Sequence, residues 1–312
     1  MSKHKIAVVG IGKISLDQHL PVIARNENFE LVATVSQRGI TVGDTPTFRT
    51  QAELFKAIPD LDAVANCVPP LVRHTMVREA LIAGKHVLIE KPPSPSVSEF
   101  DDMIACAKQN NRVLFATWHS QFNVAVDQTR DILARDGVKS IRIDWRESVR
   151  KWHPGQDWVW EPGGFGVCDP GINALSILTK IMPEPVFVRH ATLEVPANRQ
   201  TPVGAEIKFK TASDNGLDIS AGFNWLEESG EVWKFSIETA RGQQLQLEAG
   251  GTKLSVDGEL LVQNDSAEYE AIYEMFDDLL QAKRSDTHGA PLRLMADVFL
   301  IAERVTVAPF NW

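Results

Sequence analysis

The sequence predicts two domains of different architecture: an α/β domain built on a parallel sheet, and an α+β domain with a mostly antiparallel, open sheet. Up to about residue 117, short apolar runs alternate with helix-like segments, which is the pattern of parallel strands joined by crossover helices. After about residue 118, several strand-like runs follow one another, which is typical of an antiparallel sheet. The length of 312 residues suits about two domains.

The first strand of the parallel sheet is predicted over the apolar run Ile6–Val9, which ends in the turn Gly10-x-Gly12 and leads into an amphipathic segment. The first glycine permits a tight turn, and the second lets the backbone approach a pyrophosphate at the positive end of the following helix. Ser15 occupies the third position of the usual glycine pattern. The joint predicts a dinucleotide-binding turn of the Rossmann type, although such joints also occur without any nucleotide.

Four more short apolar runs predict the other strands of the parallel sheet, because strands buried on both faces carry few polar residues. They are Glu30–Ser36, Ala63–Cys67, His86–Glu90 and Val113–Ala116. Helices are expected between these strands. One helix is predicted to begin at Ser96-x-x-Glu99, which has the pattern of a capping box.

The second part of the chain predicts both helices and strands. Helix-like runs cover residues 124–133, 172–181, 268–283 and 291–307. The strand-like runs are Phe187–Glu194, Ala205–Lys210, Leu217–Phe223, Trp233–Glu238 and Gln243–Glu248. We therefore expect a Rossmann-type domain over residues 1–118, an α+β substrate domain over 119–290, and a C-terminal helix within 291–312 that packs back on the first domain.

The composition argues against several classes of function. The net charge is −9 and no block of Lys and Arg is present, so neither nucleic acid nor an anionic membrane is an expected partner. No apolar run reaches the ~20 residues of a membrane helix and the N-terminus lacks a secretory pattern, so we expect a cytoplasmic protein. The scattered Cys67, Cys106 and Cys168 are expected to be reduced. The histidines lack ligand spacing, so no metal is expected.

Ligands of open parallel sheets bind at the carboxyl ends of the strands, so the residues after each strand are the first candidates for chemistry. The second strand is followed by Ser36-Gln37-Arg38. An acidic residue here usually binds the ribose 2'-hydroxyl of NAD, whereas an arginine suits the 2'-phosphate of NADP. The alternative is that Arg38 is a solvated loop cation.

Two further strand ends carry unusual residues. The third strand is followed by Cys67-Val-Pro69-Pro70, where the prolines impose a turn that could shape a nicotinamide or adenosine slot. The fourth is followed by Glu90-Lys91-Pro92. Charges at the edge of a core are costly unless they are used, and the alternative to a functional role is a plain ion pair.

With these spacings, the glycine turn, the C-x-P-P turn and especially Glu90-Lys91-Pro92 resemble the glucose-fructose oxidoreductase and inositol dehydrogenase (Gfo/Idh/MocA) family. The segments 115–120, 152–155, 160–164 and 169–173 are similar to the aldose branch of that family, the bacterial L-arabinose and D-galactose 1-dehydrogenases. The resemblance implies oxidation of a pyranose C1 hydroxyl to a lactone. The sugar would be L-arabinose, D-galactose or D-fucose, and hydride would pass to NADP, preferred or equal, or to NAD.

The resemblance and the strand ends together give an expected cofactor-binding set. Its members are Gly10, Gly12, Lys13, Ile14, Ser36, Gln37, Arg38, Cys67, Pro69, Pro70, Glu90, Lys91 and His119. The three residues expected to be catalytic are Lys91, Asp169 and Asn173.

Removal of hydride from C1 requires a base for the hydroxyl proton. Lys91 would act as that base if desolvation lowers its pKa, or would stabilise the developing oxyanion as a cation. Many family members place a histidine at the position of Asn173, and an amide cannot replace it as a base. Proton transfer is therefore expected to fall to Lys91 or Asp169, or to both, while Asn173 positions the sugar. The alternative for Asp169 is a helix N-cap.

Sugars offer hydroxyl edges and apolar faces, which suit polar partners and aromatic walls. The expected substrate-binding residues are Lys91, His119, Glu147, Trp152, His153, Asp169, Asn173 and Trp233. A lone histidine such as His119 is often a structural hydrogen bonder. Trp158 and Trp160 have core packing as their alternative.

Two other functions remain open on this fold. One is a non-catalytic NAD(P)-binding regulator that resembles the galactose-pathway repressor inhibitors, and the other is a dehydrogenase of another polyol such as an inositol. The presence of Lys91, Asp169 and Asn173 favours an enzyme. Pairing of copies through the sheet of the second domain is also open.

Overall fold

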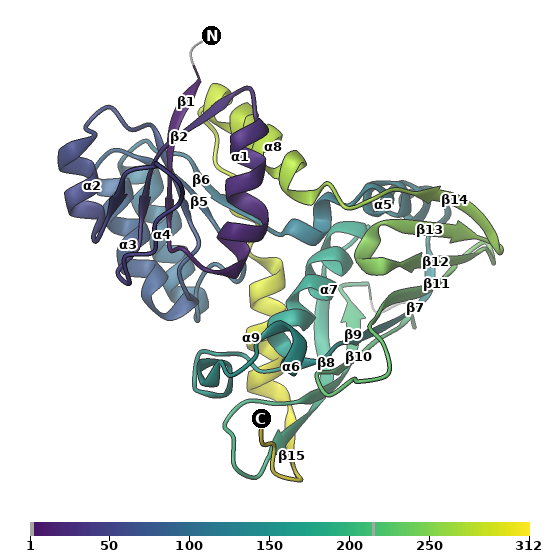
Figure 1. The fold of residues 1–312 in the computed structure, drawn as a ribbon. Helices are drawn as coiled ribbons and strands as arrows, with labels where there is room; N and C mark the ends of the chain where they lie inside the picture. Colours follow the sequence, from purple (N-terminus) through teal and green to yellow (C-terminus); the bar gives the residue numbers. More distant parts are fainter. Residues whose placement is uncertain (1–2, 214–215) are drawn as a thin grey trace. The chain divides into compact units, whose positions relative to one another are not determined.

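The computed structural model of the chain describes residues 3–213 and 216–312 (Figure 1). The chain divides into two compact units. The first unit comprises residues 1–119 and 267–289, and the second comprises residues 120–266 and 290–312. The predicted fold class is confirmed in both units, with a parallel sheet in the first and a mixed, mostly antiparallel sheet in the second.

Within the described residues, the first unit contains a six-stranded sheet in which every neighbouring pair is parallel. The order is β3 (Thr47–Phe48), β2 (Phe29–Val35), β1 (His4–Val9), β4 (Ala63–Asn66), β5 (His86–Ile89) and β6 (Leu114–Ala116). All five predicted strands form, and the two-residue β3 was missed because it is too short to carry a pattern. β4 is fully buried, as expected for a strand covered on both faces.

The helices of the first unit follow the strands along the chain. They are η1 (Ser15–His19), α1 (Leu20–Arg25), α2 (Gln51–Ala57), α3 (Pro70–Ile82), α4 (Val97–Gln109) and α8 (Glu268–Ala282), with η2 (His119–Phe122) at the unit boundary. α4 begins as predicted, since the Ser96 hydroxyl accepts a hydrogen bond from the Glu99 N–H at 3.3 Å.

The segment that returns to the first unit is α8, not the C-terminal helix as expected. Its apolar face packs on the core of this unit. The ring of Phe29 lies 5.4 Å from that of Tyr273 and stacks on Phe276 at 5.6 Å. Phe276 also stacks on Phe115 at 6.1 Å. Aromatic burial of this size explains why residues 267–289 belong to the first unit.

Within the described residues, the second unit contains a nine-stranded sheet. The order is β14 (Glu259–Gln263), β13 (Lys253–Val256), β12 (Gln244–Glu248), β11 (Val232–Thr239), β7 (Val138–Arg146), β10 (Asp218–Asn224), β9 (Gly204–Thr211), β8 (Val186–Pro196) and β15 (Glu303–Val307). Neighbours are antiparallel except for β7 with β10 and β8 with β15, which are parallel.

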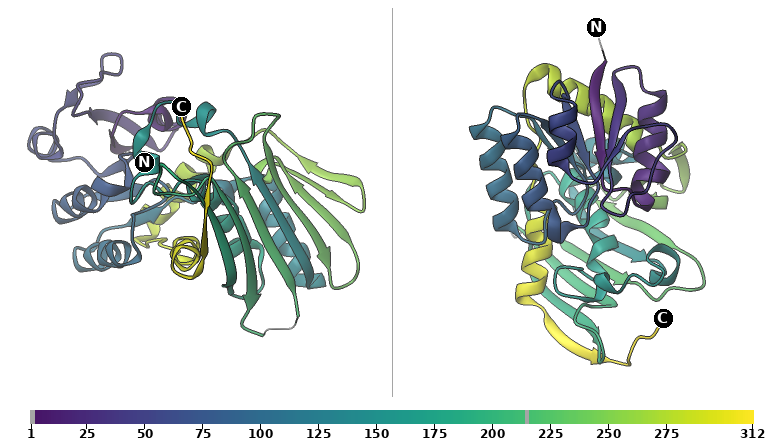
Figure 2. Two further views of the ribbon diagram at one scale, coloured as in Figure 1. Left: turned by 90° about the horizontal axis from the view of Figure 1, so that it is seen from below. Right: turned by 60° about the vertical axis from the view of Figure 1, so that its left-hand side comes forward.

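One face of this sheet is covered by helices (Figure 2). The elements of the unit are α5 (Val124–Asp136), α6 (Val149–Trp152), η3 (Asp157–Trp160), α7 (Cys168–Ile181), η4 (Ala249–Gly251) and α9 (Ala290–Ile301). Along β7, Ile141, Ile143 and Trp145 are buried toward the helices, whereas Arg142 and Asp144 alternate with them. α5, α7 and α9 pack against the apolar side.

The C-terminal segment corrects two expectations. The predicted helix over residues 291–307 ends at Ile301, and residues 303–307 form β15, which pairs with β8. α9 and β15 belong to the second unit, where α9 packs on α7 and β8. The β-branched Val305, Thr306 and Val307 suit an added edge strand. β7, β13 and β14 were also absent from the predicted elements.

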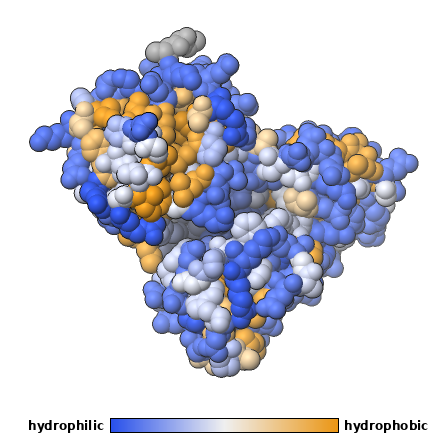
Figure 3. Space-filling model, in the orientation of Figure 1, coloured by the Kyte–Doolittle hydropathy of each residue, from blue (hydrophilic) through white to orange (hydrophobic). Residues whose placement is uncertain are grey.

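Figure 3 shows hydrophobic side chains gathered on the visible face of the first unit. The exposed apolar residues of this unit include Ile14 and Leu16 after β1, and Leu71 and Val72 after β4.

In the described ranges, no helix is long and apolar enough to cross a membrane.

Candidate active site

The turn after β1 requires glycine at its first position. Gly10 has a φ of 92°, and a Cβ at this residue would lie 2.8 Å from Cγ1 and 2.9 Å from the backbone N of Val68. At Gly12, a Cβ would meet no atom within 4 Å. The backbone at Gly10 therefore packs directly on the loop after β4, whereas the backbone at Gly12 has free space beside it. Free space at Gly12 fits the close approach of a dinucleotide.

Ser15 fills the third position of the glycine pattern with a bond of its own. The Gly12 N–H donates to the Ser15 Oγ at 2.8 Å, and the hydroxyl donates to the Gly12 carbonyl oxygen at 2.8 Å. Lys13 pairs with Asp17 on the surface, and Ile14 is 36% exposed. The serine thus stabilises the turn from inside.

The loop after β2 folds back onto the glycine turn. Nη2 of Arg38 donates to the Ile11 carbonyl oxygen at 3.3 Å, so the guanidinium lies beside the turn. Ser36 is buried and its Oγ accepts the Ile40 N–H, while Gln37 is exposed. A second cation, Arg49, donates to the Gln37 carbonyl oxygen at 2.6 Å. The two arginine side chains give this loop positive charge, which suits an anion bound next to the glycine turn.

The turn after β4 leads directly into a helix. Pro70 is the first residue of α3 and Pro69 is its N-cap, so the helix begins with residues that lack an N–H. Cys67 is a half-buried free thiol. The expected turn is present at the same edge of the sheet as the glycine turn.

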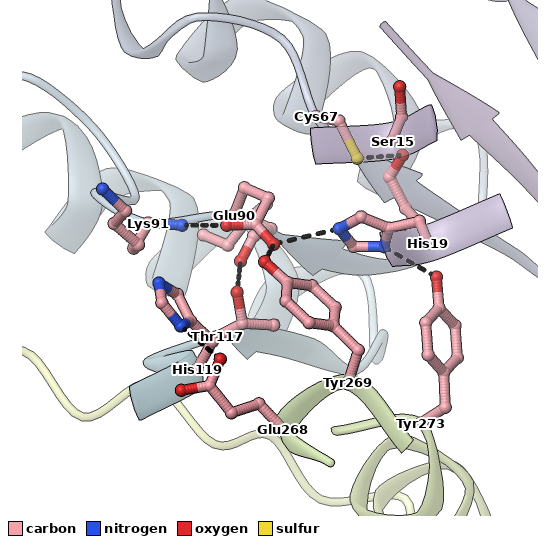
Figure 4. A network of polar contacts seen from close by, with 12 residues as sticks. Ser15, His19, Cys67, Glu90, Lys91, Thr117, His119, Glu268, Tyr269 and Tyr273 are labelled. Carbon is pink, nitrogen blue, oxygen red and sulfur yellow. Dashed lines mark hydrogen bonds and ion pairs between the residues drawn. The ribbon is translucent and has the colours of Figure 1, made fainter. Parts of the chain in front are cut away.

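Glu90 stands at the centre of a buried network after β5 (Figure 4). Its Oε1 accepts hydrogen bonds from Nε2 of His19 at 2.9 Å and from the hydroxyl of Tyr269 at 2.8 Å. Nδ1 of His19 shares a hydrogen bond of 2.8 Å with the Tyr273 hydroxyl. Oε2 of Glu90 accepts the backbone N–H of Lys91 at 3.0 Å. Glu90 therefore serves as an anchor for the backbone of Lys91, a role that goes beyond a plain ion pair with the lysine.

The ionisable groups of this network have shifted pKa values. Burial alone would raise the pKa of Glu90, but the hydrogen bond and charge of His19 outweigh it and lower that pKa to about 2. Burial alone would lower the pKa of His19, yet its interactions with Cys67, Tyr273 and Glu90 outweigh burial and raise that pKa well above its usual value. The pKa of Tyr269 is likewise raised, first by burial and then by the charge of Glu90. Both shifts favour the charged forms of the pair, the carboxylate of Glu90 and the imidazolium of His19.

His119 is held on the other side of Tyr269. Its Nδ1 lies 2.9 Å from Oε2 of Glu268, and its ring stacks on Tyr269 with the centroids 5.9 Å apart. Burial lowers the pKa of His119, but the charge of Glu268 outweighs that effect and raises it. One ring nitrogen thus has a structural partner. Lys91 itself is half-buried, and its peptide bond to Pro92 is cis.

In the second unit, α7 begins at Cys168, about one turn earlier than predicted. Its N-cap is Val167, so Asp169 lies inside the first turn and the N-cap alternative for this residue is wrong. Asp169 and Asn173 are four residues apart on the helix and share one face. A Cβ at Gly171 would lie 2.6 Å from the ring of Phe223, so glycine lets α7 approach the sheet closely.

Asp169 contacts His153 from the loop after α6. Oδ2 of Asp169 lies 3.3 Å from Nε2 of His153, and the imidazole packs edge-on against Trp225 at 5.5 Å. Asp169 is 6% exposed. The neighbouring thiol of Cys168 is inert, because burial raises its pKa to about 12.

Glu147 is occupied by tryptophans. Its carboxylate accepts the indole N–H of Trp225 at 3.3 Å and that of Trp233 at 3.1 Å. The ring of Trp233 lies 6.1 Å from that of Trp152. Trp160 is 2% exposed and belongs to the core, as its alternative stated. Trp158 is half-buried, so the core alternative does not hold for it, and Trp152, Trp158 and Trp233 are the partly exposed tryptophans of this region.

Sequence reasoning missed His19, Tyr269 and Arg73. Arg73 is 3% exposed and shares the buried face of α3 with Val77 and Ala80, at helical spacings of four and seven. The sequence signal for Arg73 was a charged residue placed four and seven positions before apolar residues of the same helix. For metals, no group of three or more potential ligands occurs in the part of the chain that the structure describes. Chemistry without a metal stays a prediction.

Residues 4–117 match the Gfo/Idh/MocA model, an oxidoreductase family with an NAD-binding Rossmann fold. The chain is 41% identical over 314 residues to a galactose 1-dehydrogenase of Pseudomonas fluorescens, with 99% of each protein covered. The structure of a D-galactose-1-dehydrogenase from Rhizobium etli superposes with a TM-score of 0.95 at 45% identity, covering 100% of this chain and 99% of that one.

More distant structures share the fold alone. A 3-ketoreductase from Actinomadura kijaniata, in complex with NADP and TDP-benzene, has a TM-score of 0.84 at 17% identity and covers 98% of this chain and 100% of its own. A myo-inositol 2-dehydrogenase from Lactobacillus plantarum has a TM-score of 0.79 at 12% identity and covers 96% and 98%.

Proposed function

Because the chain belongs to the Gfo/Idh/MocA family of oxidoreductases, we propose that it oxidises the C1 hydroxyl of an aldopyranose to the aldonolactone. The sugars that we propose are D-galactose, L-arabinose and D-fucose, which share ring stereochemistry from C2 to C4 and differ at C5. Full-length similarity to two proteins named galactose 1-dehydrogenase supports this choice.

The first unit offers the features of a dinucleotide site, and NAD(P)⁺ bound there would supply the acceptor for the C1 hydride. Gly10 and Gly12 would let the backbone approach the pyrophosphate. Arg38 would bind a 2'-phosphate, so we propose that NADP is used at least as well as NAD. Lys13, Ile14, Ser36 and Gln37 would line the same loops.

We propose that the Lys91 ammonium meets the charge that develops on the C1 oxygen. The single observation that carries the proposal is the anchoring of the Lys91 backbone by buried Glu90, because the backbone that carries a transition-state-stabilising side chain must be fixed before the reaction begins. Cys67, Pro69, Pro70 and Glu90 would shape the surroundings of the nicotinamide.

The C1 hydroxyl proton must leave with its electron pair retained on oxygen, so that the C1–O double bond forms as hydride departs. We propose that Lys91 and Asp169 together hold the C1 hydroxyl and that the Asp169 carboxylate receives its proton, because the Lys91 ammonium has no lone pair and Asn173 has no basic lone pair at neutral pH. His153, whose Nε2 contacts Oδ2 of Asp169, would remain a polar partner of the Asp169 carboxyl group as that group gains the proton. Asn173, on the same helix face, would orient the sugar.

Recognition of the sugar is proposed to involve both apolar and polar residues. Trp152 and Trp233 would face the C–H surface of the ring, and His153 and His119 would meet hydroxyls. The Glu147 carboxylate accepts hydrogen bonds from the indole N–H groups of Trp225 and Trp233. Its proposed contribution is therefore to hold these tryptophans in place.

The test is whether D-galactose plus NADP, with purified protein, yields the near-ultraviolet absorbance of reduced nicotinamide and a lactone detectable by NMR. A panel of aldoses and inositols with both cofactors defines the substrate. Turnover with an inositol alone would replace the sugar assignment. Binding of NADP without turnover on any sugar would replace the enzyme with a regulator.

We also propose that copies pair through the sheet of the second unit. The strand faces opposite the helices carry complementary charges, among them Arg142, which pairs with Glu206 at 3.0 Å and with Asp144 at 3.3 Å. Light scattering of the wild type and of Arg142→Glu tests this, because repulsion would dissociate a pair that uses this face.

A further inference from the structure

Arg73 joins two of the loops that follow neighbouring strands. Its Nη2 and Nε donate to the Val68 carbonyl oxygen, at 2.5 and 3.1 Å, in the turn after β4. Its Nη1 donates to the carbonyl oxygens of Glu90 and Pro92, in the loop after β5. One guanidinium therefore binds backbone on both sides of Lys91 and in the adjacent turn.

The arrangement completes the anchoring of Lys91. The carboxylate of Glu90 accepts the Lys91 N–H, while Arg73 binds the carbonyl oxygens of Glu90 and Pro92, the residues on either side of Lys91 in the chain. The segment 90–92 is thus tied to two buried charged side chains. These bonds restrict the backbone that carries the Lys91 ammonium.

Burial makes these bonds matter. Arg73 is 3% exposed, and a charge removed from water is tolerated only when its donors are satisfied. The planar guanidinium has five donors in a fixed fork and reaches three carbonyls from one position. A lysine ammonium is a point charge on a flexible stem and cannot span the same three oxygens.

We propose that Arg73 is a positioning residue for Lys91 and for the turn after β4, an inference that rests on the proposed role of Lys91 in catalysis. Arg73 fixes the backbone from which Lys91 reaches the reacting oxygen. It also locks that backbone to the Val68 turn, which itself closes on Gly10. One side chain thereby joins the loops after β4 and β5, and the first of these loops contacts the glycine turn.

The first experiment needs no activity. Hydrogen exchange of the Glu90 and Lys91 amides is followed in the wild type, in Arg73→Lys, and in Arg78→Lys as the matched control. Arg78 lies on the same helix and pairs with Asp102 on the surface at 2.6 Å. We expect exchange at both amides to accelerate on the order of tenfold or more in Arg73→Lys and to stay unchanged in Arg78→Lys. Equal exchange in all three proteins overturns the proposal.

Should Arg73→Lys fail to fold, exchange in the wild type can still overturn the proposal. The two amides must exchange on the order of 10²-fold more slowly than in an unstructured peptide, as expected for a loop held closed. Exchange at the unstructured rate would mean that no such clamp exists in solution.

The second experiment measures catalysis per folded site, with sites counted by NADP binding. A displaced Lys91 predicts that kcat in Arg73→Lys falls on the order of 10²-fold while the sugar KM and the NADP Kd change about threefold at most. Added methylguanidinium should restore part of kcat to Arg73→Ala and leave the Arg78→Ala variant unaffected. A purely structural role predicts fewer folded sites with normal kcat and no rescue. If wild-type protein oxidises no sugar, the proposed function fails while the exchange experiment still stands.

Discussion

Replacing Glu90 by glutamine should destabilise the first unit strongly. Glu90→Gln keeps the shape of the side chain but removes the charge that faces His19, so a buried imidazolium is left without its counter-ion. The neutral amide also meets the N–H of Lys91 and the Tyr269 hydroxyl with only one acceptor oxygen. Removal of one partner from a buried ion pair typically costs about 3–5 kcal/mol.

The pKa of Glu90 sets the pH window of this effect, because the interaction with His19 lowers it from 4.5 to about 2 in the folded protein. Because the folded pKa is depressed, this stabilisation is present above pH 4.5 and is lost as the pH falls toward about 2. The raised pKa of His19 acts oppositely: its contribution is complete below pH 6.5 and fades as the pH rises through the folded value.

The assay is urea unfolding of wild type and Glu90→Gln between pH 3 and 9, by circular dichroism, with hydrogen exchange at the β5 amides reporting on the first unit alone. The difference in unfolding free energy should be largest between pH 4.5 and 6.5 and should shrink at both extremes. Asp60→Asn removes an exposed partner of Lys5 and should change nothing measurable. A difference below about 1 kcal/mol, or one independent of pH, would refute the reasoning.

The remaining predictions concern catalysis and are read from steady-state kinetics. Arg38→Ala should raise KM for NADP on the order of 10- to 100-fold more than for NAD, and equal effects would reject the 2'-phosphate role. Lys91→Ala should nearly abolish kcat with NADP binding intact, whereas a loss below about tenfold removes Lys91 from the chemistry. Asp169→Asn should collapse kcat even at high pH if Asp169 accepts the proton; recovery in base indicates an orienting role. Asn173→Ala should raise sugar KM and lower kcat moderately, since no proton acceptor is lost.

The parallel sheet was predictable because its signals are local. Each of β1, β2, β4, β5 and β6 is a short apolar run followed by turn residues, and its short length and flanking turns favour a strand buried on both faces over a helix. The Gly10 turn, with its positive φ and its contact with Val68, is likewise specified by the residue itself. β7 was within reach as well, because Ile141, Ile143 and Trp145 alternate with charged residues.

Other features required the packed structure. The amphipathic pattern of residues 268–283 predicts a helix with an apolar face, but it cannot say which core that face covers. Residues 303–307 continue a helical-looking segment and become β15 only because the edge of β8 is available for pairing. The Pro170-Gly171 pair suggested that Asp169 caps the helix, but α7 begins at Cys168 and therefore includes Asp169.

By itself, the sequence determined the fold class and the family resemblance, because strand periodicity, turn glycines and the Glu90-Lys91-Pro92 motif are written in contiguous residues; its site residues stay predictions. Only the tertiary structure decided what holds Lys91. His19, Arg73 and Tyr269 lie far apart in the chain and meet around Glu90 and its neighbours. Contacts of this kind depend on the distances that folding sets between separate elements, and no local pattern encodes those distances.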